Sequence, residues 1–534
     1  MARHPAAFLA LLVLLAAGCA RLPAAIPEGS GVWRGCLNRN PVTLDPAYVV
    51  TLLDSSICAL LYNGLVRFDE SGRVVPDLAR TMPDVSADGL TYTFELRRGV
   101  RFHNGRELTA EDVVYSFRRI LDPATISRRS WVFEAVEGAV AFNRDERTDL
   151  PGVRAEGSHR VVITLAWPLA HFLSLLAMPA GYVVDRNEVE RHTDPRDYGF
   201  HPVGTGPWVL ESWVPGAYLR LRANPDYFEG RPHLDALDYR IIEDGATAVA
   251  EFRAGNLHLL RLGPVEHAVF QRDPRWEGFL VGAPDLAVYY LALNCEKEPF
   301  DNVLVRQAVN HAIDRQAILE AVLPGRYVLA NGSIPPGLDG HDPHLEGYRY
   351  DPALARRLLA AAGYPRGFRM EIVQTSSPGV LQITEPIQRM LAEVGVEARL
   401  VQLESGAFFA TIGDQGNPDC FFVSWWADIP DAENFLYPLF HSRNRGGGGN
   451  RARFSDPAVD AILDRARLTL GAAERSELYR DAQRLVFSQA PWVPLYFPIN
   501  YLACRPEVGG FVACSIANAQ KMTGVWLAPP PAAD

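Results

Sequence analysis

The sequence predicts an α/β protein, and three observations support this class. After about residue 300, helical segments alternate with single strands, the pattern of an α/β lobe with a largely parallel sheet. Residues 33–285 are richer in strands and turns, which indicates a mixed α+β body. The last stretch, Val493–Val525, is strand-like again and would return to the first body, so that the second body is an insertion. At about 150 residues per domain, the 534 residues correspond to several domains or one large two-lobed body.

Local patterns predict the elements of the first half. Residues 90–97 alternate apolar and polar side chains, which indicates a half-buried strand, and Asp88-Gly89 supplies the turn before it. Thr109-Ala110-Glu111-Asp112 is similar to a capping box, and apolar residues then recur at helical spacing, so a helix is expected to begin there. Val161–Leu165 has the character of a buried strand that leads into a short helix.

The second half contains several predicted helices around one clear strand. The strand is Val396–Leu403, which alternates after Gly395 has ended a helix. The predicted helices cover about Asn302–Leu323, a segment from Asp351-Pro352 to Gly363, Ile387–Glu393, and a long region from Ser455 to Gln489 that breaks into two near Gly471.

Composition and charge exclude several classes of function. Fractions of 48% hydrophobic and 22% charged residues are typical of soluble globular proteins. The net charge is −11, and the arginines are scattered along the chain, so no nucleic-acid partner is expected. No CxxC spacing indicates a zinc site and no Gly-x-Ser-x-Gly elbow is present, so we expect no metal, no cofactor and no enzymatic activity.

The N-terminus predicts export. Residues 1–18 begin with a short positively charged segment, continue with an apolar run and end in small residues, as in a secretory signal peptide. Leu15-Ala16-Ala17-Gly18-Cys19 resembles the lipobox of bacterial lipoproteins, with Ala16 where those usually have Leu. That resemblance implies acylation of Cys19, with residues 19–32 as a tether on the outer side of a bacterial membrane. Plain cleavage near Ala17 or Ala24 is the alternative.

The later part of the chain predicts neither a membrane span nor a defined disulfide set. The longest uncharged stretch, Val161–Val184, is interrupted by Pro168, Pro179 and Gly181, and a buried core segment explains it better. Six cysteines follow Cys19, and export permits disulfides. Cys504 and Cys514 are close in sequence and are the first candidates for a bridge, with buried free thiols as the alternative.

Motifs in a fixed order point to a known family. They are Leu44-Asp45-Pro46 with Leu61–Val66, Asp88–Phe94 with Leu96–His103, Leu108–Val113, Pro202–Trp208, Leu293–Ala308 and Tyr350–Pro365. Together they resemble the extracytoplasmic solute-binding proteins of peptide-type ABC importers, family 5, which include oligopeptide-, dipeptide- and nickel-binding proteins. One departure is Asn63, where the family usually has Glu.

The resemblance implies a two-lobed periplasmic-binding-protein type II fold whose second lobe is inserted in the first. Lobe I would comprise residues 33–288, including an extra subdomain, and would resume at 495–534, while lobe II would comprise residues 289–494. The hinge strands are expected near Tyr289–Asn294 and Pro494–Tyr501. The protein would then be a monomer that closes around a solute and docks on an ABC permease with its ATPase subunits.

The same resemblance implies a ligand site on lobe II. Trp425-Trp426-Ala427-Asp428 is similar to the family segment whose Asp receives the α-amino group of a bound peptide. The segment follows an apolar strand, so the Asp428 carboxylate would emerge at a strand end, where α/β sheets place ligand groups. Trp425 would form a wall of the pocket, with core packing as its alternative. Asp428 could instead cap the helix that begins near Asp431.

On the other side of the cleft, Val50 and Leu52 match positions where the oligopeptide-binding relatives run their backbone beside the ligand, as in strand addition. Tyr290 matches a pocket tyrosine at the hinge, and Tyr289 would then face the core. Nothing matches the Arg that dipeptide-binding relatives use for the ligand's carboxylate. The solute would therefore be a longer peptide or a non-peptide such as a metal chelate, sugar or opine. A sensor or chaperone without a permease is the third interpretation.

Overall fold

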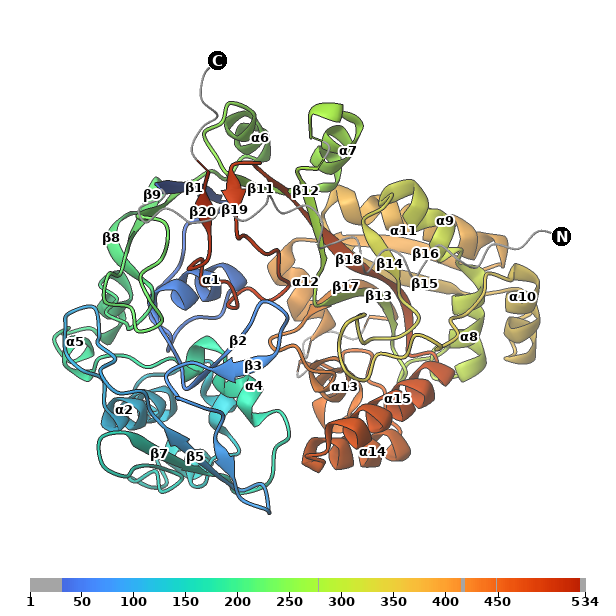
Figure 1. Cartoon of the computed structure of the whole chain (residues 1–534). Coiled ribbons are helices and arrows are strands. Elements are labelled where there is room, and N and C mark those ends of the chain that lie inside the picture. The colour runs from blue at the N-terminus through green and yellow to red at the C-terminus, as the bar shows by residue number, and fades with distance from the viewer. Residues whose placement is uncertain (1–30, 277, 414–417, 448, 529–534) are drawn as a thin grey trace.

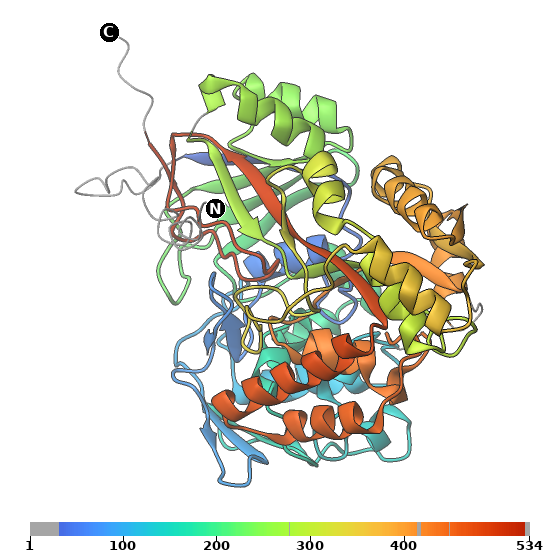
Figure 2. The same ribbon diagram turned by 90° about the vertical axis from the view of Figure 1, so that its right-hand side faces the viewer.

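The computed structural model describes residues 31–276, 278–413, 418–447 and 449–528, and it has two bodies side by side (Figure 1). One contains the chain up to about residue 285 together with the C-terminal segment, and the other contains most of the rest. The long strand β18 (Trp492–Cys504) runs from one body to the other, and this is clearest in Figure 2. The predicted signal peptide, Cys19 and nearly all of the predicted tether lie outside the described residues.

The first body contains two four-stranded sheets. One has the order β1 (Val32–Leu37), β10 (Ala236–Ile241), β9 (Tyr218–Ala223) and β8 (Trp208–Val214), with helix α1 (Leu52–Leu61) packed against it. The other has the order β4 (Asp84–Val85), β5 (Thr91–Glu95), β7 (Arg160–Thr164) and β6 (Val153–Ala155). Strand β1 pairs with β10 in parallel although 198 residues of sequence separate their ends, so this sheet depends on long-range pairing.

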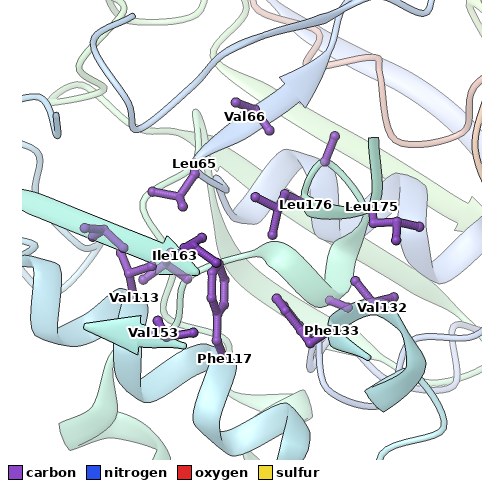
Figure 3. Close-up of a cluster of buried hydrophobic side chains, with 14 of the residues drawn as sticks. Leu65, Val66, Val113, Phe117, Val132, Phe133, Val153, Ile163, Leu175 and Leu176 are labelled. Carbon is purple, nitrogen blue, oxygen red and sulfur yellow. The ribbon is translucent and has the colours of Figure 1, made fainter. Parts of the chain in front are cut away.

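The second of these sheets belongs to a subdomain with its own apolar core (Figure 3). Helix α2 (Ala110–Leu121) covers the sheet and begins with the predicted capping box, in which Asp112 bonds back to Thr109. Phe117 of this helix lies against Phe133, with 4.6 Å between their ring centroids. Helix α4 (Phe172–Leu176) closes the cluster, and its position after β7 confirms the predicted strand and short helix.

The second body is built on a mixed sheet. Its strand order is β18, β13 (Ala287–Leu293), β17 (Cys420–Trp426), β15 (Arg369–Thr375) and β16 (Glu397–Leu403). Only the pairs of β15 with β16 and with β17 are parallel among these, whereas β13 is antiparallel to both of its neighbours. The expectation of a largely parallel sheet was therefore wrong for half of the sheet. The two strands that connect the bodies enter and leave in opposite directions, which makes their pairing antiparallel.

The helices of the second body differ from the predictions at several places: the helix predicted over Ile387–Glu393 begins at Pro378, and the helix Ser405–Ile412 was not predicted. Instead of one helix over residues 302–323 there are two, α8 (Val303–Ala312) and α9 (Arg315–Val322). Asp314 interrupts them because its carboxylate caps α9 through Ala317 N. The remaining helices are α10 (Pro352–Ala361), α11 (Pro378–Glu393), α12 (Ser405–Ile412), α13 (Glu433–Phe440), α14 (Pro457–Leu468) and α15 (Ala472–Ser488). The break near Gly471 is confirmed.

Strand β18 joins the two bodies because each end pairs with a different partner. Its first part pairs with β13, while residues 499–504 pair with β11 (Leu259–Leu262) and β12 (Leu280–Pro284) of the first body. A short strand, β14 (Tyr327–Leu329), also pairs with its middle. The chain thus passes into the second body along β12 and β13 and returns along β18, as expected for an inserted lobe.

Two further expectations can be compared with the described residues. No disulfide joins Cys504 to Cys514, so the suggested bridge between them is wrong. None of the helices in the described ranges is long and apolar enough to span a bilayer. Residues 161–184 instead form most of β7, α4 and the turn that follows, and most of them are buried, many in the subdomain core.

Candidate functional site

Two adjoining cavities lie where the bodies face each other. Their volumes are about 790 Å³ and about 500 Å³, within the range of about 300–1,000 Å³ usual for small-molecule sites. Both are lined by residues of the first body and by residues of the second body. They share several lining residues, among them Leu53, Arg261, Asp285, Trp426, Asn500 and Ala517. We call them the larger and the smaller cleft cavity.

Asp428 lies in the smaller cleft cavity, two residues after the end of β17. Its backbone N–H donates to Asn434 Oδ1 at 3.0 Å, which fixes the turn between β17 and α13. Its carboxylate oxygen Oδ1 accepts from Arg129 Nη1 at 3.0 Å, and the side chain remains 37% exposed. Asp428 is therefore a partly open carboxylate at the cleft.

The helix-cap alternative for Asp428 is not what the structure shows. Helix α13 starts at Glu433, and Asp431 Oδ1 accepts a hydrogen bond from Glu433 N at 2.9 Å. Asp431 is also paired with Arg475 at 2.9 Å. Because Asp431, rather than Asp428, accepts from the first N–H of α13, the carboxylate of Asp428 is left for contacts across the cleft.

Arg129 is a member of the site that the sequence did not reveal. It comes from a turn of the first body, just before the short helix Ser130–Phe133, where no motif marks it. Its guanidinium donates to the carbonyls of Val49 at 3.1 Å and Val50 at 3.2 Å in addition to Asp428. Arg129 thus joins the backbone of residues 49 and 50 in the first body to the Asp428 carboxylate in the second body.

The predicted backbone segment also lines the smaller cleft cavity. Val50 and Leu52 are 42% and 50% exposed, high values for aliphatic side chains. Between them, Thr51 caps helix α1 by accepting from Asp54 N at 3.1 Å. Thr51 itself is extended, and Leu52 is the first residue of α1, so the cap fixes the point where the chain enters the helix at the cavity wall.

The two tryptophans after β17 have different surroundings. Trp426 is 36% exposed and lines both cleft cavities. Trp425 is half-buried against the core of the second body and lines neither of these two cavities. Since successive strand residues point to opposite faces, only one of the pair can face the cleft. Of the two tryptophans, the structure therefore places Trp426, rather than Trp425, at the wall of these cavities.

The two hinge tyrosines face opposite ways from the expectation, which placed Tyr290 in the pocket and Tyr289 in the core. Tyr290 is 1% exposed and stacks on Trp492, with ring centroids 3.5 Å apart, inside the core of the second body. Tyr289 lines the larger cleft cavity and stacks on Tyr496 at 4.6 Å. Both faces of β13 are covered by core clusters, so alternation by itself did not show which face meets the cavity. Tyr290 is a core residue and Tyr289 is the candidate wall residue.

A polar cluster shared by both cavities was also missed. Arg261 of β11 donates through Nε to Asn500 Oδ1 at 2.9 Å, and Asn500 Nδ2 donates to Asp285 Oδ1 at 3.2 Å. Burial raises the pKa of Asp285, and the charge of Arg261 opposes that rise. The three residues come from β11, β18 and the end of β12, so only the pairing of these strands brings them together.

In the described part of the chain, no group of three or more His, Cys, Asp or Glu side chains is arranged to hold a metal ion. The groups that line the smaller cleft cavity include carboxylates, guanidinium groups and one exposed indole. These groups bind charged and hydrogen-bonding solutes, and the exposed indole adds apolar contact area.

Comparison with known proteins also indicates solute binding. Residues 73–447 match the family described as bacterial extracellular solute-binding proteins, family 5. The chain is 34% identical over 500 residues to heme-binding protein A of Haemophilus influenzae, with 89% of each chain covered. It is 33% identical to a probable di/tripeptide-binding protein of Pseudomonas aeruginosa, covering 91% of this chain and 94% of that one. It is also 31% identical to a glutathione-binding protein of Salmonella choleraesuis, covering 92% and 91%.

Solved structures agree on the fold. An unliganded open form of the murein tripeptide-binding protein MppA has a TM-score of 0.80 at 27% identity, covering 95% of this chain and 99% of that one. HbpA2 from Haemophilus parasuis has a TM-score of 0.80 at 30% identity, covering 93% and 99%. The two-lobed fold is thus shared along nearly the whole length. The relatives that carry a descriptive name are binding proteins rather than enzymes. The chain belongs to the family 5 bacterial extracellular solute-binding proteins.

Proposed function

We propose that this protein captures short peptides between its lobes and delivers them to the permease of an ABC importer. The observation behind this proposal is the partly open carboxylate of Asp428 beside the backbone carbonyls of residues 49 and 50 in one cavity. A peptide amino terminus needs a carboxylate partner, and its N–H groups need acceptors. Relatives named for di/tripeptides and for glutathione support the same class of ligand.

The bound peptide would use groups from both lobes. Its ammonium would pair with Asp428, and its backbone would run along residues 50–52 in the manner of an added strand. Trp426 would cover an apolar part of the ligand. Closure of the lobes would remove water from the ammonium–carboxylate pair, which strengthens their attraction.

Delivery would take place at a membrane surface. Acylation of Cys19 would anchor the protein there, because each buried methylene of an acyl chain contributes about 0.8 kcal/mol. Residues 19–32 would act as the tether that lets the two-lobed body reach its permease.

The first experiment identifies the solute. Protein purified under native conditions is denatured, and the released small molecules are analysed by mass spectrometry. Peptides with free amino termini support the proposal. Release of a metal chelate, a sugar or an opine would contradict it. Release of heme, visible as a Soret band before denaturation, would favour the activity for which the Haemophilus influenzae relative is named.

A second experiment tests Asp428 directly. Asp428→Ala is expected to weaken binding of a released peptide at least tenfold by calorimetry, because loss of one partner of a buried charge pair costs about 3–5 kcal/mol. The same peptide with an acetylated amino terminus is the control. It should bind the two proteins equally, since it carries no ammonium. Unchanged affinity for the free peptide would remove Asp428 from the site.

A further inference from the structure

The polar cluster shared by both cavities, formed by Arg261, Asn500 and Asp285, contains a guanidinium whose orientation is fixed. Arg261 pairs with Leu502 across β11 and β18, close to where β18 crosses between the lobes. Its Nε donates to Asn500 Oδ1 at 2.9 Å, which fixes the orientation of the planar group. The side chain is nevertheless 62% exposed and lines both cleft cavities. Arg261 is therefore oriented by the protein and open to a ligand.

The remaining N–H groups of Arg261 have unused capacity. The nearest carboxylate is that of Asp285, whose Oδ2 lies 3.7 Å from Nη2, longer than a hydrogen bond. Within the described residues, the only hydrogen bond of this guanidinium is the one to Asn500. A guanidinium has five N–H donors, and two parallel donors match the two oxygens of a carboxylate. A free carboxylate is thus the chemistry that this group would recognise.

The smaller cleft cavity combines this cation with an anion of the other lobe. It is lined by both Arg261 and Asp428, within about 500 Å³. A molecule with an ammonium at one end and a carboxylate at the other complements this pair of charges. A short peptide with free termini has that form.

We propose that Arg261 binds the carboxyl terminus of a short peptide whose amino terminus pairs with Asp428. This inference rests on the proposed function and adds a limit on ligand length, because both termini must fit in one cavity. Asn500 acts as a positioning residue that holds the guanidinium fork toward the ligand.

Two other arginines line the same cavity but are less suited to this role. Arg129 already donates to two carbonyls and to Asp428. Arg39 follows β1 in a loop, and the described residues provide no hydrogen bond that would orient its side chain. Arg39 therefore serves as a matched control, since it places the same charge in the same cavity.

The test uses peptides that differ only at the carboxyl end. Ligand-free protein, prepared by unfolding and refolding, is incubated with synthetic random-sequence peptides of two to five residues. Half of the mixture has a free carboxyl terminus, and half has a carboxyl-terminal amide. Captured peptides are quantified by mass spectrometry. We expect the wild-type protein to retain the free-acid forms at least tenfold over the amides.

The variants separate the possible outcomes. Arg261→Gln should lose the preference and capture both forms about equally, whereas Arg39→Gln should keep it. Circular dichroism and melting temperature verify that both variants fold. Equal capture of acids and amides by the wild type would overturn the role of Arg261 but not the proposed function. An equal loss of preference in Arg39→Gln would show a general charge effect and overturn it as well. Capture of no peptide at all would overturn the proposed function itself.

Discussion

Arg129 of the first lobe donates to Asp428 of the second at 3.0 Å, across 299 residues of sequence. The same guanidinium donates to the carbonyls of Val49 and Val50. These three acceptors are the groups that a peptide amino terminus and backbone would use. In the proposed mode of binding, Arg129 would therefore compete with a peptide for these groups, and it also links the lobes.

Removing this competitor should tighten binding. Arg129→Gln frees the carboxylate and both carbonyls, so we expect the dissociation constant for a released peptide to fall several-fold in calorimetry. Arg128→Gln removes the neighbouring charge and is the control. Weaker binding in Arg129→Gln would mean that the arginine organises the site rather than competing for it.

The two tryptophans should separate binding from stability. Trp426→Ala removes an exposed wall of both cavities, so it should weaken peptide binding with little change in melting temperature. Trp425→Ala should instead cost about 2 kcal/mol of stability, below the range for a fully buried aromatic because it is only half-buried. Chemical denaturation and calorimetry on both variants give the comparison. The opposite assignment of effects would contradict this division.

His103 predicts an acid-sensitive step in stability. It accepts from Gly204 N and contacts Gly206 O at 3.0 Å, and burial lowers its pKa from 6.5 to about 4. The unfolded chain therefore binds a proton at higher pH than the folded protein. Stability should fall as the pH decreases from about 6.5 to about 4 and should level off below that.

The variant His103→Gln isolates this contribution. It does not titrate, so the difference in unfolding free energy between it and the wild type should shrink as the pH falls through that window. Urea denaturation at pH 7, 5.5 and 4 measures the difference. A difference independent of pH would show that His103 is not the titrating group. His258, whose pKa is also lowered to about 4, is present in both proteins and cancels.

The predicted lipid anchor is tested by fractionation. In a bacterial host, Cys19→Ser expressed with its own leader should move from the membrane to the soluble extracytoplasmic fraction, because a serine hydroxyl does not accept the acyl group. A change at Cys36, which the lipobox resemblance does not include, should leave the distribution as in the wild type. A Cys19→Ser protein that stays with membranes would point to another form of attachment.

Much of the local structure and the family could be read from the residues. The capping box at Thr109, the helix opened by Asp351-Pro352 and the break at Gly471 depend on neighbours within a few positions, and the structure has all three. The family motifs are also local in sequence. Asp428 was a candidate because its segment resembles the family's amine-binding segment and follows an apolar strand, and the structure places Asp428 at the cleft just after β17.

The composition of the cleft depended on tertiary structure. Alternation along β13 shows that Tyr289 and Tyr290 face opposite ways, but both faces of this strand are buried, so only the packing decides which tyrosine meets the cavity. Arg129 and Arg261 have no local signal, because their side-chain partners Asp428 and Asn500 lie more than 200 residues away. Sequence by itself determined the elements and the family, since caps, turns and periodicity act between neighbours. The charges that face each other across the cleft were decided only by the way β18 brings the two lobes together.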